Sequence, residues 1–333
     1  NTITQILNNM KIKHLLCFIA LCLFFTPGKA QQLSVMTLRN GATVYIWEDK
    51  SKPDVFGMIA FKVGSVDDPE QYTGLAHYLE HVMFKGTQTI DALDWEKEKP
   101  IYEKIIAKYD ERAALSDPAA REAIDKEIND LTREAAQYAA GNEFSLLVDH
   151  MGGQGLNAST GYDQTEYHNS FPPSQLEKWL EIYSERLIDP VFRGFQTELE
   201  AVYEEYNMYN DDRGSRMREF IYEQAFGDHP YARPIIGLPE HLKNPQLSKL
   251  IDFYNTWYGP QNMSIILVGN IDAKEAIPMI RDKFERVPRR AEIHREKKPV
   301  RQFKGRTEKS AKIFYYPMLA LIYNGAVSYT HLT

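Results

Sequence analysis

The chain has 333 residues, of which 43% are hydrophobic and 26% charged, a composition that provides a sizeable globular core. With 39 basic and 46 acidic residues, its formal net charge is −7. Because an acidic chain has no general attraction for phosphate backbones, we expect no nucleic acid among its partners.

Residues 1–30 comprise a few upstream residues and the pattern of a secretory signal peptide. Met10 opens a short basic segment, an apolar run follows from Leu15 to Phe25, and small residues precede a cleavage site after Ala30. The alternative is a membrane anchor, but eleven apolar residues are too few to cross a bilayer, so no stable membrane span is expected.

Both cysteines, Cys17 and Cys22, lie inside this signal, so the mature chain has no disulfide and no thiol ligand or nucleophile. Without residues 1–30 the chain keeps 36 basic and all 46 acidic residues, a formal charge of −10. The export signal and the absence of cysteine from the mature chain together predict localisation in the bacterial periplasm.

The first mature elements are strands. Residues 33–63 carry β-branched and aromatic runs around an Asn40-Gly41 pair, which favours a hairpin, and a third strand is expected over 55–63. A helix is expected from about Gln71 to Phe84, ending near Gly86.

Residues 94–140 are highly charged, with two apolar stripes at helical spacing separated by an Asp117-Pro118 helix start. This segment predicts an inserted antiparallel helical hairpin whose charges mark a solvated face. Further along, extended segments are expected over 156–160, 165–171 and 263–268, and helices over 173–188, 195–211, 213–226, 246–257 and 273–284.

The domain organisation follows from these elements. Residues 31–290 are expected to form one domain, and residues 291–333 a basic, proline-containing linker with the truncated start of a next domain. Within that last part, Ile313 to Tyr323 could begin a strand, and the final ten or so residues look non-native.

His77-Tyr78-Leu79-Glu80-His81 is the feature that carries chemistry. On a helix, His77 and His81 project from one face and can hold one metal ion, while Glu80 can reach a metal-bound water as the general base. Zinc, one per chain, is the metal that such ligands favour. The alternative is a pair of surface histidines on an amphipathic helix.

A third ligand is expected from the acidic segment 198–205. Glu198 and Glu205 lie two turns apart on one helical face, and Glu204 competes with Glu205 as the ligand. By itself this segment would be read as a solvated acidic helix.

The segment from Gly74 to Thr87 resembles the zinc helix of the pitrilysin family, which includes insulin-degrading enzyme and the mitochondrial processing peptidases. The Glu-x-x-Ala-Val-x-x-Glu pattern resembles the family's second zinc segment, which implies Glu205 as the ligand and Glu198 as a supporting residue. A further likeness lies in residues 254–270. The resemblance implies an α+β fold, a mainly antiparallel sheet covered by helices.

The same resemblance implies that residues 157–160 form an edge strand that pairs with an extended peptide, led by Asn157 and Ala158. It also implies a C-terminal half or partner subunit that closes the site and that this chain lacks. His229, in a loop beside a proline, is assigned to capping or packing.

The resulting hypothesis is a zinc-dependent endopeptidase, an inverzincin that hydrolyses extended peptides or unfolded polypeptides, with little activity expected from this chain alone. The alternative is a non-catalytic or partner-dependent subunit of a peptidase-like assembly.

Overall fold

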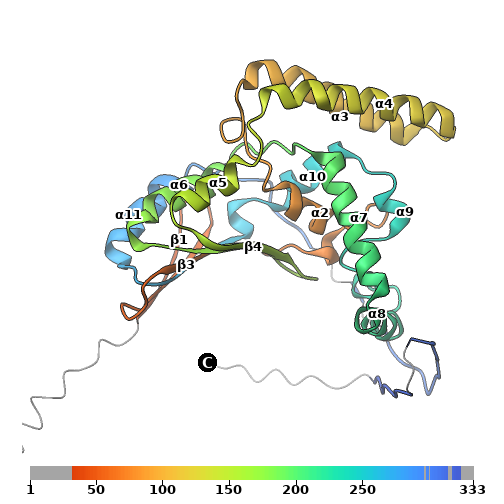
Figure 1. Ribbon diagram of the computed structural model, residues 1–333. Coiled ribbons are helices and arrows are strands. Elements are labelled where there is room, and N and C mark those ends of the chain that lie inside the picture. The colour runs from red at the N-terminus through yellow and green to blue at the C-terminus, as the bar shows by residue number, and fades with distance from the viewer. Residues whose placement is uncertain (1–31, 296–297, 300, 314–316, 324–333) are drawn as a thin grey trace, which may run out of the picture.

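A computed structural model describes residues 32–295, 298–299, 301–313 and 317–323 (Figure 1). The signal peptide expected in residues 1–30 and the last ten residues lie outside this part of the chain. The strands are β1 (Gln32–Thr37), β2 (Thr43–Glu48), β3 (Val55–Phe61), β4 (Gln154–Thr160), β5 (Thr165–Phe171) and β6 (Met263–Gly269).

The longer helices follow these strands along the chain. They are α2 (Leu75–Val82), α3 (Trp95–Ala114), α4 (Pro118–Ala135), α5 (Glu143–His150), α6 (Leu176–Glu185), α7 (Phe195–Asp211), α8 (Arg213–Phe226), α10 (Leu247–Trp257) and α11 (Ala273–Phe284). The shorter helix α9 spans Pro239–Leu242.

The six strands form one sheet in the order β1-β2-β6-β3-β5-β4. All pairs are antiparallel except β2 with β6. Along β3 and β5, buried and half-buried residues alternate, as expected of a sheet with one face on the core. Figure 1 shows α5, α6 and α11 on that face. The expected mainly antiparallel α+β fold is therefore confirmed.

The hairpin between β1 and β2 follows from Asn40-Gly41. Gly41 has a φ of +101°, a conformation that favours glycine, and its N–H donates to the carbonyl oxygen of Leu38 at 3.0 Å. The Asn40 amide also donates to the carbonyl oxygens of Phe284 and Val287, which fixes the turn against the end of α11.

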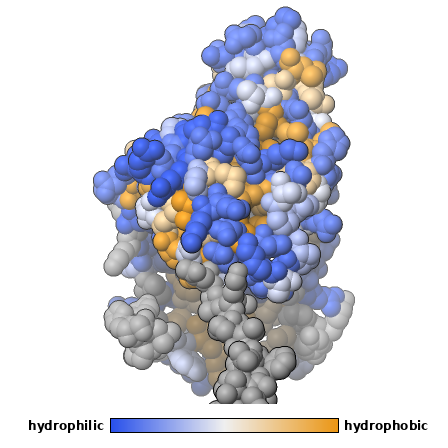
Figure 2. Space-filling view, turned by 90° about the vertical axis from the view of Figure 1, so that its left-hand side faces the viewer, coloured by the Kyte–Doolittle hydropathy of each residue, from blue (hydrophilic) through white to orange (hydrophobic). Residues whose placement is uncertain are grey.

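The inserted hairpin is also confirmed. α3 and α4 pack against each other and stand apart from the sheet (Figure 1). The Asp117 side chain accepts from the Ala120 N–H at 2.9 Å and caps α4, while Ile124 and Ile128 are buried. On the face of the molecule seen in Figure 2, hydrophilic side chains predominate and apolar ones lie in smaller groups.

Three local expectations need correction. The helix that carries His77 and His81 begins at Leu75 rather than near Gln71, because Gly74 adopts a left-handed φ of +90°. An additional helix, α5, has no counterpart among the predicted elements, because the segment is only eight residues long. Of the strand considered for 313–323, residues 314–316 lie outside the described part of the chain, and the described residues 313 and 317–323 are in no helix or strand. The linker and domain boundaries remain predictions.

Candidate metal centre

Buried charged groups hold both ends of α2. The Asp68 carboxylate accepts hydrogen bonds from the Gly74 N–H at 2.7 Å and the Ala76 N–H at 2.9 Å. At the other end, Arg186 Nη2 donates to the Met83 carbonyl oxygen at 3.0 Å. Burial raises the pKa of the Asp68 carboxyl group to about 7; its ionised form at the N-terminus and the Arg186 cation at the C-terminus both match the helix dipole. Hydrogen bonds to other parts of the protein therefore fix both ends of the helix independently of any metal ion.

Two histidines of α2 meet a glutamate of α7. Glu205 Oε2 lies 3.5 Å from His77 Nε2 and 3.5 Å from His81 Nε2, and candidate ligand atoms of the three residues all lie within 4.8 Å of one another. His77 is 8% exposed, whereas His81 and Glu205 are half-buried. The structure thus brings together two imidazoles and one carboxylate.

These three side chains fit a zinc ion. Ligands at about 2.0–2.1 Å in tetrahedral geometry place neighbouring ligand atoms roughly 3.4 Å apart, close to the two nitrogen–oxygen separations in this site. Separations of 3.5 Å are longer than those of strong hydrogen bonds, so the direct contacts among the three groups are weak. Two imidazoles with one carboxylate are also a donor set found in catalytic zinc sites.

The two histidines differ in their electrostatic surroundings. Burial lowers the pKa of His77 to about 4, which keeps its imidazole neutral, the state that binds metal. Burial also acts to lower the pKa of His81, but contacts with Glu198 and Glu205 outweigh it and raise that pKa to about 9. Without metal, His81 therefore carries the proton that stabilises the two carboxylates.

Glu80 shares a pocket of about 220 Å³ with His77 and Glu205. Burial raises the pKa of its carboxyl group, although a hydrogen bond from Thr160 opposes the effect. In that bond Thr160 Oγ1 donates to Glu80 Oε2 at 2.5 Å. Thr160 is absent from the sequence-based site, because no local pattern reveals a contact between residues 80 positions apart.

Glu198 lies behind the ligands. Its Oε2 is 3.5 Å from His81 Nδ1, and its Oε1 is 2.5 Å from Lys85 Nζ. Burial opposes ionisation, but contacts with His81 and Lys85 outweigh it and lower the pKa of Glu198. The carboxylate can therefore orient the His81 ring from the side away from Glu205.

Adjacent glutamates of α7 take different places. Glu205 joins the histidines, whereas Glu204 lines a separate pocket with Gln196 and Glu200, next to the inserted hairpin. Because consecutive helical residues are about 100° apart, only one of them can face α2.

The residues expected to bind substrate lie on β4, which is at the edge of the sheet. Asn157 is exposed and pairs with His168 of β5, while Ala158 lines the pocket that contains Glu80. His229 is not in this pocket; its Nδ1 accepts from the Tyr231 N–H at 3.2 Å, so it caps a short turn.

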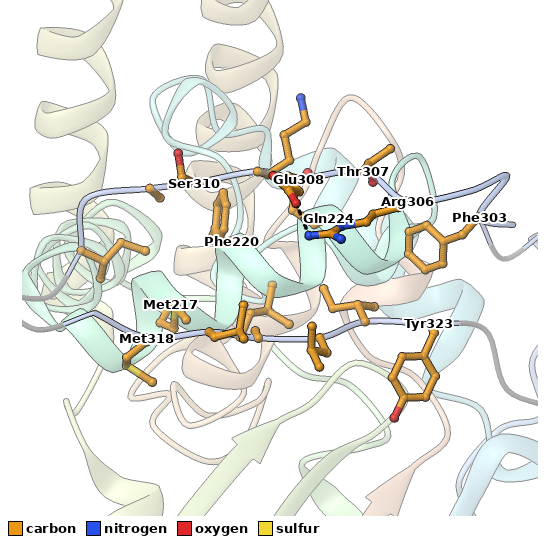
Figure 3. A pocket seen from close by; sticks show the side chains of 18 of the residues that line it. Met217, Phe220, Gln224, Phe303, Arg306, Thr307, Glu308, Ser310, Met318 and Tyr323 are labelled. Atoms are coloured by element: carbon orange, nitrogen blue, oxygen red, sulfur yellow. Dashed lines mark hydrogen bonds and ion pairs between the residues drawn. The ribbon is translucent and has the colours of Figure 1, made fainter.

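A different pocket lies between α8 and the described parts of the chain in 301–313 and 317–323. Figure 3 shows Met217 and Phe220 of α8 facing this pocket, and Met318 and Tyr323 on the C-terminal segment that lines it. No residue of the metal centre lines this pocket. Within the part of the chain that the structure describes, no helix combines the length and apolar character needed to cross a membrane.

Two family models match the chain. The model of the insulinase family, peptidase family M16, matches residues 43–99 and 131–238, and a model described as the peptidase M16 inactive domain matches residues 246–329. The gap in the first match lies within the inserted hairpin.

Curated relatives are zinc proteases. The probable zinc protease PqqL of Escherichia coli is 25% identical over 270 residues, which cover 78% of this chain and 23% of PqqL. The zinc protease PqqE of Helicobacter pylori is 24% identical over 254 residues, 75% of this chain and 46% of PqqE. The chain therefore spans less than half the length of either relative.

Solved structures share the fold. Pitrilysin matches with a TM-score of 0.61 and 22% identity, over 82% of this chain and 25% of pitrilysin. The first half of the periplasmic protease PqqL of Escherichia coli matches with a TM-score of 0.61 and 24% identity, over 82% of this chain and 50% of that structure. The insulinase match includes all three candidate ligands, Glu80 and Glu198, and the resemblance drawn from the sequence is confirmed: the chain belongs to the M16 family of peptidases.

Proposed function

We propose that this chain is the metal-binding half of a zinc-dependent endopeptidase that hydrolyses extended peptides or unfolded polypeptides. A single observation carries the proposal: His77, His81 and Glu205 place their ligand atoms within 4.8 Å of one another, and two of them, His77 and Glu205, line one pocket with Glu80. Zinc proteases among the relatives support it.

The ligands supply the binding site, and zinc bound there would supply Lewis acidity, which acidifies water and polarises a peptide carbonyl. Glu80 takes a proton from the attacking water at its carboxylate and delivers it to the nitrogen of the leaving amine. The water oxygen joins the carbonyl carbon as the C–N bond breaks. A raised pKa suits Glu80 to both transfers, and the Thr160 hydroxyl fixes its orientation.

The substrate is held along β4. One side of this edge strand pairs with β5, which leaves the backbone groups of its other side available to an extended peptide. Main-chain pairing at Asn157 and Ala158 would bind many sequences with little side-chain selectivity. Because Ala158 lines the Glu80 pocket, such a peptide would pass beside the general base.

The complete enzyme contains more than this chain. The matched residues cover only 23% of PqqL and 46% of PqqE, which supports a C-terminal half or partner subunit that closes the site. We therefore propose that this chain alone binds zinc but cleaves peptides weakly. Export to a periplasm is proposed from the signal pattern, supported by the periplasmic location of PqqL.

Glu80→Gln in the complete enzyme tests the assignment of the base. The variant is expected to keep its zinc and to lose at least about 100-fold in kcat, because the amide cannot accept the proton. Glu204→Gln is the matched control, since Glu204 lines the other pocket, and it should retain activity. Comparable peptide cleavage by Glu80→Gln and the control would remove Glu80 as the base.

A further inference from the structure

The inserted hairpin contacts the chain just before α7, the helix that carries Glu205. Glu98, Tyr102 and Tyr109 of α3 are four and seven residues apart, a spacing that places them on one face of the helix. This face of α3 contacts residues 192–196.

The first contact is a buried ion pair. Arg193 donates from Nε to Glu98 Oε1 at 2.6 Å and from Nη2 to Glu98 Oε2 at 2.8 Å, and the two side chains are 9% and 2% exposed. Arg193 Nη1 also donates to the Lys85 carbonyl oxygen, three residues beyond α2. One turn further along α3, the Tyr102 hydroxyl accepts from the Phe192 N–H at 3.3 Å.

The second contact is a cluster of three aromatic rings. Tyr109, 2% exposed, meets Phe195 edge to face with 4.8 Å between ring centroids. Phe195, the first residue of α7, lies 4.8 Å from the ring of Tyr78, whose hydroxyl donates to the Phe195 carbonyl oxygen. Tyr78 directly follows the ligand His77. The ring of Phe195 is thus held between the hairpin and the zinc helix.

From these contacts we propose that α3 of the inserted hairpin is a positioning element for the metal centre. Through Arg193 and Phe195 it fixes the start of α7 against α2 and so holds Glu205 at ligand distance from the two histidines. Glu98 and Tyr109 are positioning residues, and neither touches the metal. The inference rests on the proposed zinc site and adds a function for a hairpin whose residues 100–130 the insulinase model does not match.

Tyr109→Leu tests the ring contact. Zinc affinity of the purified protein, measured by competition with a chromogenic chelator, is expected to fall at least about 10-fold, as it does when groups supporting metal ligands are removed. Tyr109→Phe keeps the ring and loses only a 3.3 Å hydrogen bond to Gln196, so its affinity should stay near wild type. Ile280→Ala, a buried change in α11, controls for general destabilisation.

A double-mutant cycle with Glu205→Gln tests whether the hairpin affects zinc affinity through Glu205. If the hairpin acts through Glu205, Tyr109→Leu has no further effect on zinc affinity in the Glu205→Gln background. An equal loss in both backgrounds, no loss in either, or an equal loss in Ile280→Ala would overturn the inference. Should Tyr109→Leu fail to fold, Phe195→Leu probes the same contact from α7 and must show the same dependence. Wild-type protein that binds no zinc would instead overturn the zinc site itself.

Discussion

At the scale of single residues, the two histidines of the candidate metal centre differ in their protonation state. His77 is kept neutral by burial, whereas His81 is kept charged in the metal-free chain by Glu198 and Glu205. Zinc binding at the proposed site would therefore displace a proton from His81 but none from His77. Lys85 beside Glu198 preserves a negative charge behind His81 once that proton has left.

Zinc affinity should consequently depend on pH. Between pH 7 and 9 the metal-free site holds a proton on His81 that zinc must displace, so the apparent Kd is expected to fall about 10-fold per pH unit and to level off near pH 9. Chelator competition at pH 7, 8 and 9 measures this, with chelators corrected for their own protonation. A flat response would mean that His81 is neutral in the metal-free protein.

At the scale of elements, α2 depends on groups outside itself. It has eight residues, too few to be stable alone, and Asp68 accepts from the N–H groups of the N-cap Gly74 and of Ala76 from within the core. The edge strand β4 completes the other wall of the pocket.

Asp68→Ala is expected to lower the free energy of unfolding by at least about 2 kcal/mol, because two buried donors lose their acceptor. The matched control is Asp117→Ala at the exposed N-cap of α4, which should cost about 1 kcal/mol. Urea denaturation of both variants gives the comparison. Equal losses would show that Asp68 acts only as an ordinary helix cap.

If β4 binds substrate through its backbone, N-methylation of a peptide substrate should reveal an alternation. Methyl groups on amides that face β4 are expected to raise KM, because each removes a main-chain donor, while methylation one residue along should change KM little. Steady-state kinetics of the complete enzyme with a series of singly methylated peptides tests this. A series without alternation would argue against strand pairing.

At the scale of the whole molecule, local patterns predicted much of the fold. Helices α7, α8 and α11 and strand β5 have the bounds that residue spacing indicates, because their apolar periodicity and N-caps are local. The parallel pairing of β2 with β6 could not be predicted, since it joins strands more than 200 residues apart. For the same reason the contacts of Thr160 with Glu80 and of α3 with Arg193 appear only in three dimensions.

The proposed three-ligand zinc site is tested most directly by the zinc content of the purified mature chain. Plasma mass spectrometry measures it beside His81→Ala, Glu205→Gln and the control Glu204→Gln. We expect about one zinc per chain in wild type and Glu204→Gln, and a sharp loss in the other two variants. Wild-type protein without zinc even after zinc is supplied, or zinc retained by Glu205→Gln and lost from Glu204→Gln, would contradict the proposed site.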